Sequence, residues 1–72
     1  MIVVLDAEKM TDKQSTHAYL KAVLDLPEYY GNNLDALRDC LEEMSNVEIV
    51  VVNEETAGEY YEKVKRVLKS LK

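Results

Sequence analysis

The sequence predicts a small α/β domain spanning residues 1–72, with a short parallel sheet packed against three helices. Two short β-branched runs, IVVL at residues 2–5 and VEIVVV at 47–52, are separated by helical patterns. Strands that alternate with helices usually form a parallel sheet. A chain of 72 residues also has to pack every element against one core. The expected strands cover about residues 1–6 and 47–52, and the expected helices about 12–25, 34–44 and 54–71.

The first strand and helix are bounded by polar residues and by the single proline. Both β-branched runs lack polar alternation, which is typical of strands buried on both faces. The first helix is expected to begin near Thr11 or Asp12, where T-D-K-Q can form a capping box, with Ser15 as a competing cap. It has to end before Pro27, because the residue that precedes a proline is disfavoured in a helix. We expect it to direct three residues inward: Leu20, Val23 and Leu24.

The second helix has clear end signals. Gly31 is expected to supply a turn with positive φ, Asn33 is a favourable N-cap, and Asn46 can close the other end. Asp35 in the first turn suits the helix dipole. The apolar side chains share one face: Leu34, Leu37, Leu41 and Met44, with Cys40 at the edge.

The last helix is expected to run from about Glu54 to Leu71, with Asn53 as its cap. Gly58 near its start costs about 1 kcal/mol relative to Ala, so an irregular first turn is expected. One apolar stripe follows at helical spacing: Ala57, Tyr60, Tyr61, Val64, Val67, Leu68 and Leu71.

The chain has a net negative charge, and many of its acidic residues lie in one region. The net charge of −5 argues against binding to nucleic-acid phosphates or anionic membranes and favours a basic partner. Six acids but only one base, Arg38, lie between Asp25 and Glu43. One cysteine excludes an internal disulfide and leaves too few thiols for a structural zinc site. No apolar run approaches the length of a membrane span and no leader pattern is present, so we expect a cytoplasmic protein without metal or cofactor.

The acidic face of the second helix has two interpretations. Asp35, Asp39 and Glu42 lie opposite the leucines. Carboxylates four residues apart repel each other by a few tenths of a kcal/mol, so a binding role is one interpretation. The other is a solvated face on which Arg38 pairs with Asp35 and Glu42. A convex helix face offers no pocket for acid/base catalysis, which makes an enzyme the least favoured class.

Four further side chains have both structural and functional interpretations. Of the adjacent Tyr29 and Tyr30, we expect one to anchor the core edge and the other to stay exposed for binding. His17 is expected to be a surface or core-edge residue rather than a base or ligand. Cys40 is expected to be a small buried residue behind the acidic face.

The stretch LPEYYGNNLDALRDCL, residues 26–41, resembles the signature loop and helix of the barstar family, the intracellular inhibitors of barnase-type ribonucleases. It differs from the family pattern at Asn32 and Arg38. The resemblance implies an inhibitor that blocks the active site of a basic bacterial ribonuclease. Asp39 would take the place of the scissile phosphate, and Asp35 would contact the guanine and phosphate-binding region. Further contacts would come from the loop and helix: Tyr29, Gly31, Asn33, Leu34, Arg38 and Glu42.

The chain also departs from the barstar family pattern. Arg38 stands where the family has Trp, the acid that the family's last helix offers its partner has no counterpart, and the family's third strand has no matching segment. A two-stranded sheet leaves unpaired backbone groups, so one edge is expected to pair with a second copy or to be covered by the last helix. The alternative function is an acidic interaction module of the same fold that binds another basic partner or self-associates.

Overall fold

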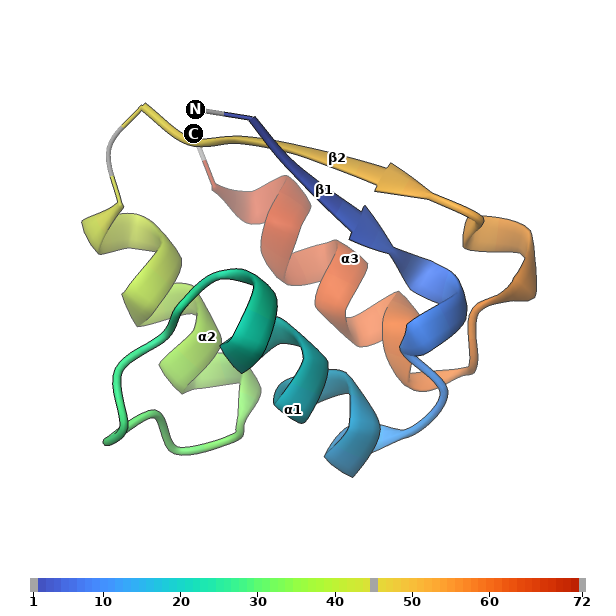
Figure 1. The fold of residues 1–72 in the computed structure, drawn as a ribbon, viewed down its shortest axis with the longest axis horizontal. Helices are drawn as coiled ribbons and strands as arrows, with labels where there is room; N and C mark the ends of the chain where they lie inside the picture. The colour runs from blue at the N-terminus through green and yellow to red at the C-terminus, as the bar shows by residue number, and fades with distance from the viewer. Residues whose placement is uncertain (1, 45, 72) are drawn as a thin grey trace.

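The computed structural model describes residues 2–44 and 46–71. It contains strands β1 (Ile2–Asp6) and β2 (Glu48–Val52), helices α1 (Lys13–Val23), α2 (Leu34–Glu43) and α3 (Tyr60–Ser70), and the 3-10 turns η1 (Ala7–Lys9) and η2 (Glu54–Thr56). The strands pair in parallel, with Val4 opposite Val50. All three helices lie on the same side of the sheet (Figure 1). The predicted α/β class and parallel pairing are confirmed, and Met1, the first residue of the expected first strand, lies outside the described residues.

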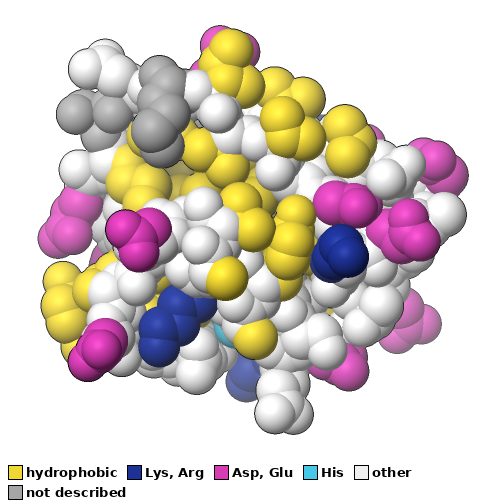
Figure 2. Space-filling model, in the orientation of Figure 1, with side chains coloured by type: hydrophobic (Ala, Val, Ile, Leu, Met, Phe, Trp, Pro, Cys, Tyr) yellow, Lys and Arg dark blue, Asp and Glu magenta, His cyan; other side chains and the backbone are white. Residues whose placement is uncertain are grey.

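Only one face of the sheet is buried, so the expectation of strands buried on both faces is wrong. Val3 and Leu5 point into the core, whereas Ile2 is 66% and Val4 55% exposed. Val50 on β2 is exposed as well, and Figure 2 shows hydrophobic side chains along the strands at the upper edge of the molecule. The reason is topological, because every helix packs against the same face.

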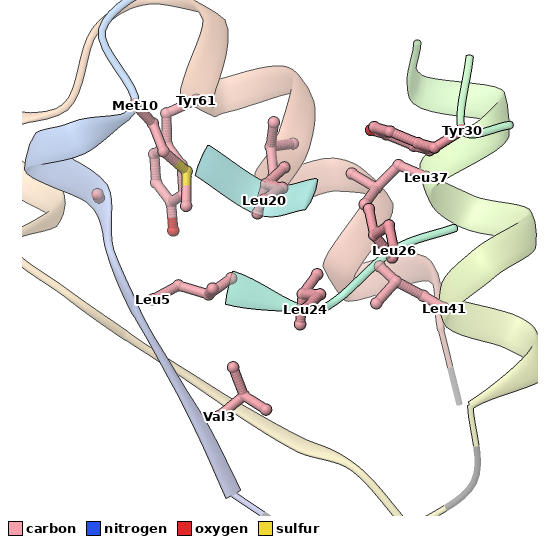
Figure 3. Packing of buried hydrophobic residues seen from close by; sticks show 12 residues of the cluster. Val3, Leu5, Met10, Leu20, Leu24, Leu26, Tyr30, Leu37, Leu41 and Tyr61 are labelled. Atoms are coloured by element: carbon pink, nitrogen blue, oxygen red, sulfur yellow. The ribbon is translucent and has the colours of Figure 1, made fainter. Parts of the chain in front are cut away.

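The core lies between the sheet and the helix layer (Figure 3). The expected inward residues Leu20 and Leu24 are buried, but Val23 is exposed at the end of α1. The chain leaves the helix after Val23, and Leu26 takes the inward position instead. The buried hydrophobic residues come from every layer: Val3, Leu5, Ala7, Met10, Leu20, Leu24, Leu26, Tyr30, Leu37, Leu41, Tyr61 and Val64.

The last helix is shorter than the sequence predicts. Residues 54–56 form the separate turn η2, and α3 begins only at Tyr60. Asn53 adopts φ 59° and makes no side-chain cap; its amide donates to Oδ1 of Asp6 instead. Between the two segments, the N–H of Gly58 donates to the carbonyl oxygen of Met10 at 3.1 Å. This contact holds the chain against the β1–α1 connection, which interrupts the helix.

Candidate protein-binding site

The loop that carries the candidate site begins at the C-terminal cap of α1. Asp25 lies just beyond the C-cap residue Leu24 and adopts φ 53°. The N–H of Leu26 donates to the carbonyl oxygen of Lys21 at 3.0 Å, the long bond of a Schellman motif. The predicted helix stop before Pro27 is confirmed, and the buried Leu26 fixes the direction in which the loop leaves the helix.

Of the two adjacent tyrosines, one is buried and the other exposed, as predicted. Tyr30 is 5% exposed and Tyr29 is 82% exposed. In Figure 3, Tyr30 lies beside Leu37 with its hydroxyl directed away from α2. Tyr30 therefore anchors the loop in the core, and this anchor leaves the ring of Tyr29 available to a partner.

Asn32, not Gly31, makes the left-handed turn before α2. Asn32 adopts φ 53° and Gly31 does not have positive φ, so the expected role of Gly31 is wrong. Asparagine tolerates this region because its short polar side chain can bond locally. Asn33 is the N-cap, as predicted: its Oδ1 accepts from the N–H of Ala36 at 2.8 Å, and its amide donates to the carbonyl oxygen of Gly31.

Helix α2 buries its leucines and exposes its carboxylates. Leu37 and Leu41 are in the core and Leu34 is partly buried, whereas Asp35, Asp39 and Glu42 are exposed. Figure 2 shows acidic side chains on the left of the molecule, over α2 and the preceding loop. Asp35 and Asp39 form no ion pair within residues 2–44 and 46–71, so their charges are available for a partner.

The described residues contain no group of three or more His, Cys, Asp or Glu side chains that could hold a metal ion. Cys40 is partly buried, and burial together with the charges of Glu43 and Asp39 raises the pKa of its thiol, which keeps it protonated. In the same part of the chain, no helix is long and apolar enough to cross a membrane.

The comparison with known families finds a match along nearly the whole chain. The model of the family described as "Barstar (barnase inhibitor)" matches residues 1–71. The chain belongs to the barstar family. A relative from Bacillus subtilis (strain 168), named "Putative ribonuclease inhibitor YrdF", is 46% identical over 39 residues. This match covers 54% of the chain and 43% of the relative, so the chain aligns with less than half of that protein's length.

Within this barstar-family fold, the structure corrects the expected position of His17. It is 1% exposed, not at the surface. Its Nδ1 is hydrogen-bonded to the hydroxyl of Tyr30, and its Nε2 lies 2.6 Å from the hydroxyl oxygen of Tyr60. Burial, with a smaller effect of Lys13, lowers the pKa of the imidazole. The sequence gives no sign of this contact, because Tyr60 is 43 residues away.

A hollow beside the acidic helix extends the candidate site to α3. It has a volume of about 410 Å³ and joins the start of α2 to α1 and α3. Its walls are formed by Lys13, Asn33, Leu34, Asp35, Tyr60 and Lys63. The sequence predicts Tyr60 only as part of the apolar stripe and gives no sign that the two lysines lie beside it. Helical periodicity alone cannot separate a core tyrosine from one at the rim of a site.

Proposed function

We propose that this barstar-family protein binds a basic ribonuclease and blocks its active site. The observation that carries the proposal is the exposed carboxylate face of α2, with Asp35 and Asp39 free of ion pairs within the described residues. An active site that binds RNA phosphate holds cationic side chains. Asp39 would accept their charge-assisted hydrogen bonds in place of the scissile phosphate.

The neighbouring residues have distinct proposed parts. Asp35 would contact the adjoining cationic region, and Tyr29 would pack against the catalytic histidine of the nuclease. Gly31, Asn33 and Leu34 would supply close contacts from the loop and the first turn of α2. Arg38 and Glu42 would lie at the border of the contact, where charge affects the rate of encounter more than the final affinity.

An RNA-cleavage assay with a purified barnase-like ribonuclease tests this proposal. Wild type is expected to inhibit cleavage. Asp39→Asn keeps the size of the side chain but removes its charge, and is expected to weaken binding by at least about 2 kcal/mol, the scale of an interface hot spot. Glu55→Gln is the matched control, because Glu55 is an exposed acid in η2, away from α2 in Figure 1. Full cleavage in the presence of micromolar wild type would contradict the proposal for that target.

A second candidate function is self-association through the sheet, and one observation favours it. Beside β2, a hollow of about 420 Å³ is lined by the strand residues Ile49 and Val51 and by Leu68 of α3. The described sheet has two strands, so the far edge of β2 has no neighbouring strand. A two-fold pairing of β2 with β2 of a second copy would fill this hollow and give a four-stranded sheet.

Sedimentation velocity tests whether the protein self-associates through β2. A dimer is expected to dissociate in Val50→Lys, because lysine on an edge strand opposes pairing with another chain. Val4→Lys is the control, because Val4 is exposed on the same face but lies on β1. Sedimentation of wild type as a monomer at high concentration would exclude self-association.

A further inference from the structure

His17 connects three parts of the fold that the sequence keeps apart. It lies on α1, and its two ring nitrogens contact the hydroxyls of Tyr30 in the binding loop and Tyr60 on α3. The ring of His17 also packs against both tyrosines, with centroid distances of 5.7 Å to Tyr30 and 5.4 Å to Tyr60. One buried side chain therefore ties the loop to two helices.

The direction of the two hydrogen bonds follows from chemistry and burial. A neutral imidazole has one donor and one acceptor nitrogen, so one tyrosine donates to the ring and the other accepts from it. Tyr30 is buried, and a hydroxyl proton without an acceptor is costly in the interior. We therefore assign Tyr30 as the donor to Nδ1, whereas Nε2–H donates to the oxygen of the partly buried Tyr60.

The two tyrosines that His17 contacts both adjoin the candidate site. Tyr30 precedes Gly31 and follows the exposed Tyr29, so fixing its ring fixes the loop on either side. Tyr60 lines the hollow that Asn33 and Asp35 also line. The contacts therefore link the loop half of the site to its helix half through the interior of the protein.

We infer that His17 is a positioning residue for partner binding: it holds the loop in the binding conformation through Tyr30 and links that loop to α3 through Tyr60. This inference rests on the proposed inhibitory function, since it assigns the loop a role in that contact. A loop held in one conformation before binding loses less conformational entropy on association. His17 itself does not touch the partner, because it is buried.

Two measurements on the same variants test this inference. Tyr30→Phe keeps the ring but removes the hydroxyl that contacts Nδ1. It is expected to increase the backbone mobility of residues 28–33 in ¹⁵N relaxation of the free protein. It is also expected to raise the inhibition constant, by up to about tenfold, the upper limit for one lost buried hydrogen bond. The salt dependence of association is expected to stay unchanged, because no charge is altered.

The controls separate positioning from general loss of stability. Val3→Ala removes core volume on β1, far from Tyr30 in Figure 3, and is expected to destabilise the protein without changing loop mobility or inhibition. His17→Gln gives a second variant that retains a donor and an acceptor, and is expected to have a smaller effect than Tyr30→Phe. Wild-type loop mobility in Tyr30→Phe would overturn the inference, whether or not wild type inhibits. Absence of inhibition by wild type would instead refute the proposed function.

Discussion

The guanidinium Nε of Arg38 lies 3.8 Å from Oε1 of Glu42, one helical turn further along α2. Both side chains are about half exposed, and such a surface pair contributes little to stability. Its effect is on the charge of the candidate binding face. Arg38 offsets one of the carboxylates that would attract a basic partner.

Replacing Arg38 is expected to speed association. Arg38→Gln makes the acidic face more negative, so its association rate with a basic ribonuclease should rise several-fold at low salt in stopped-flow measurements. The gain should shrink near physiological salt, where screening acts over about 8 Å. Arg66→Gln removes an exposed positive charge from α3 and is expected to have less effect. An equal gain from both variants would show that only net charge matters.

The N-cap residues of α1 and α2 provide a matched pair of substitutions. Oδ1 of Asp12 accepts from the N–H of Ser15 at 2.7 Å, and Oδ1 of Asn33 accepts from the N–H of Ala36 at 2.8 Å. Alanine at either position should cost about 1 kcal/mol of the free energy of unfolding in urea titrations. Only Asn33→Ala should weaken inhibition, because only Asn33 lies in the candidate site. Equal inhibition by both variants would remove Asn33 from that site.

Gly58→Ala is expected to destabilise the protein, although alanine is the better helix former. A Cβ at Gly58 would lie 2.2 Å from the carbonyl oxygen of Thr11, and this backbone contact leaves no room for a methyl group. Relieving such a clash costs about 1–3 kcal/mol. Gly31→Ala is the control and is expected to cost less stability. The atom nearest to an added Cβ there is the side-chain nitrogen of Asn33 at 3.0 Å, which can shift more easily than the backbone. A higher melting temperature for Gly58→Ala would contradict the observed path of residues 57–59.

Stability is expected to fall as the pH drops below about 6.5. Burial lowers the pKa of folded His17, so the unfolded chain takes up its proton first. Between the folded pKa and the unfolded pKa near 6.5, the unfolded state binds more protons, and the free energy of unfolding declines by up to about 1.4 kcal/mol per pH unit. The groups that act on His17 are Tyr30, Tyr60 and the cation of Lys13. His17→Gln should flatten this slope in urea titrations at pH 5 to 7, and an unchanged slope would assign it to other groups.

The sequence was sufficient for the features that depend on local chemistry. The β-branched runs, the stop before Pro27, the Asn33 cap and the two faces of α2 follow from side-chain preferences over a few residues. The proposed contact residues of the loop and helix lie in one continuous segment, so their arrangement also follows from helical geometry.

Only the tertiary structure decided the features that depend on distant contacts. The Gly58 contact with Met10 moved the start of α3, and packing of all helices on one side exposed Val4. His17 became a core residue because folding brings Tyr30 and Tyr60 to its two nitrogens. Such contacts join residues up to 48 positions apart, so no local pattern in the sequence can encode them.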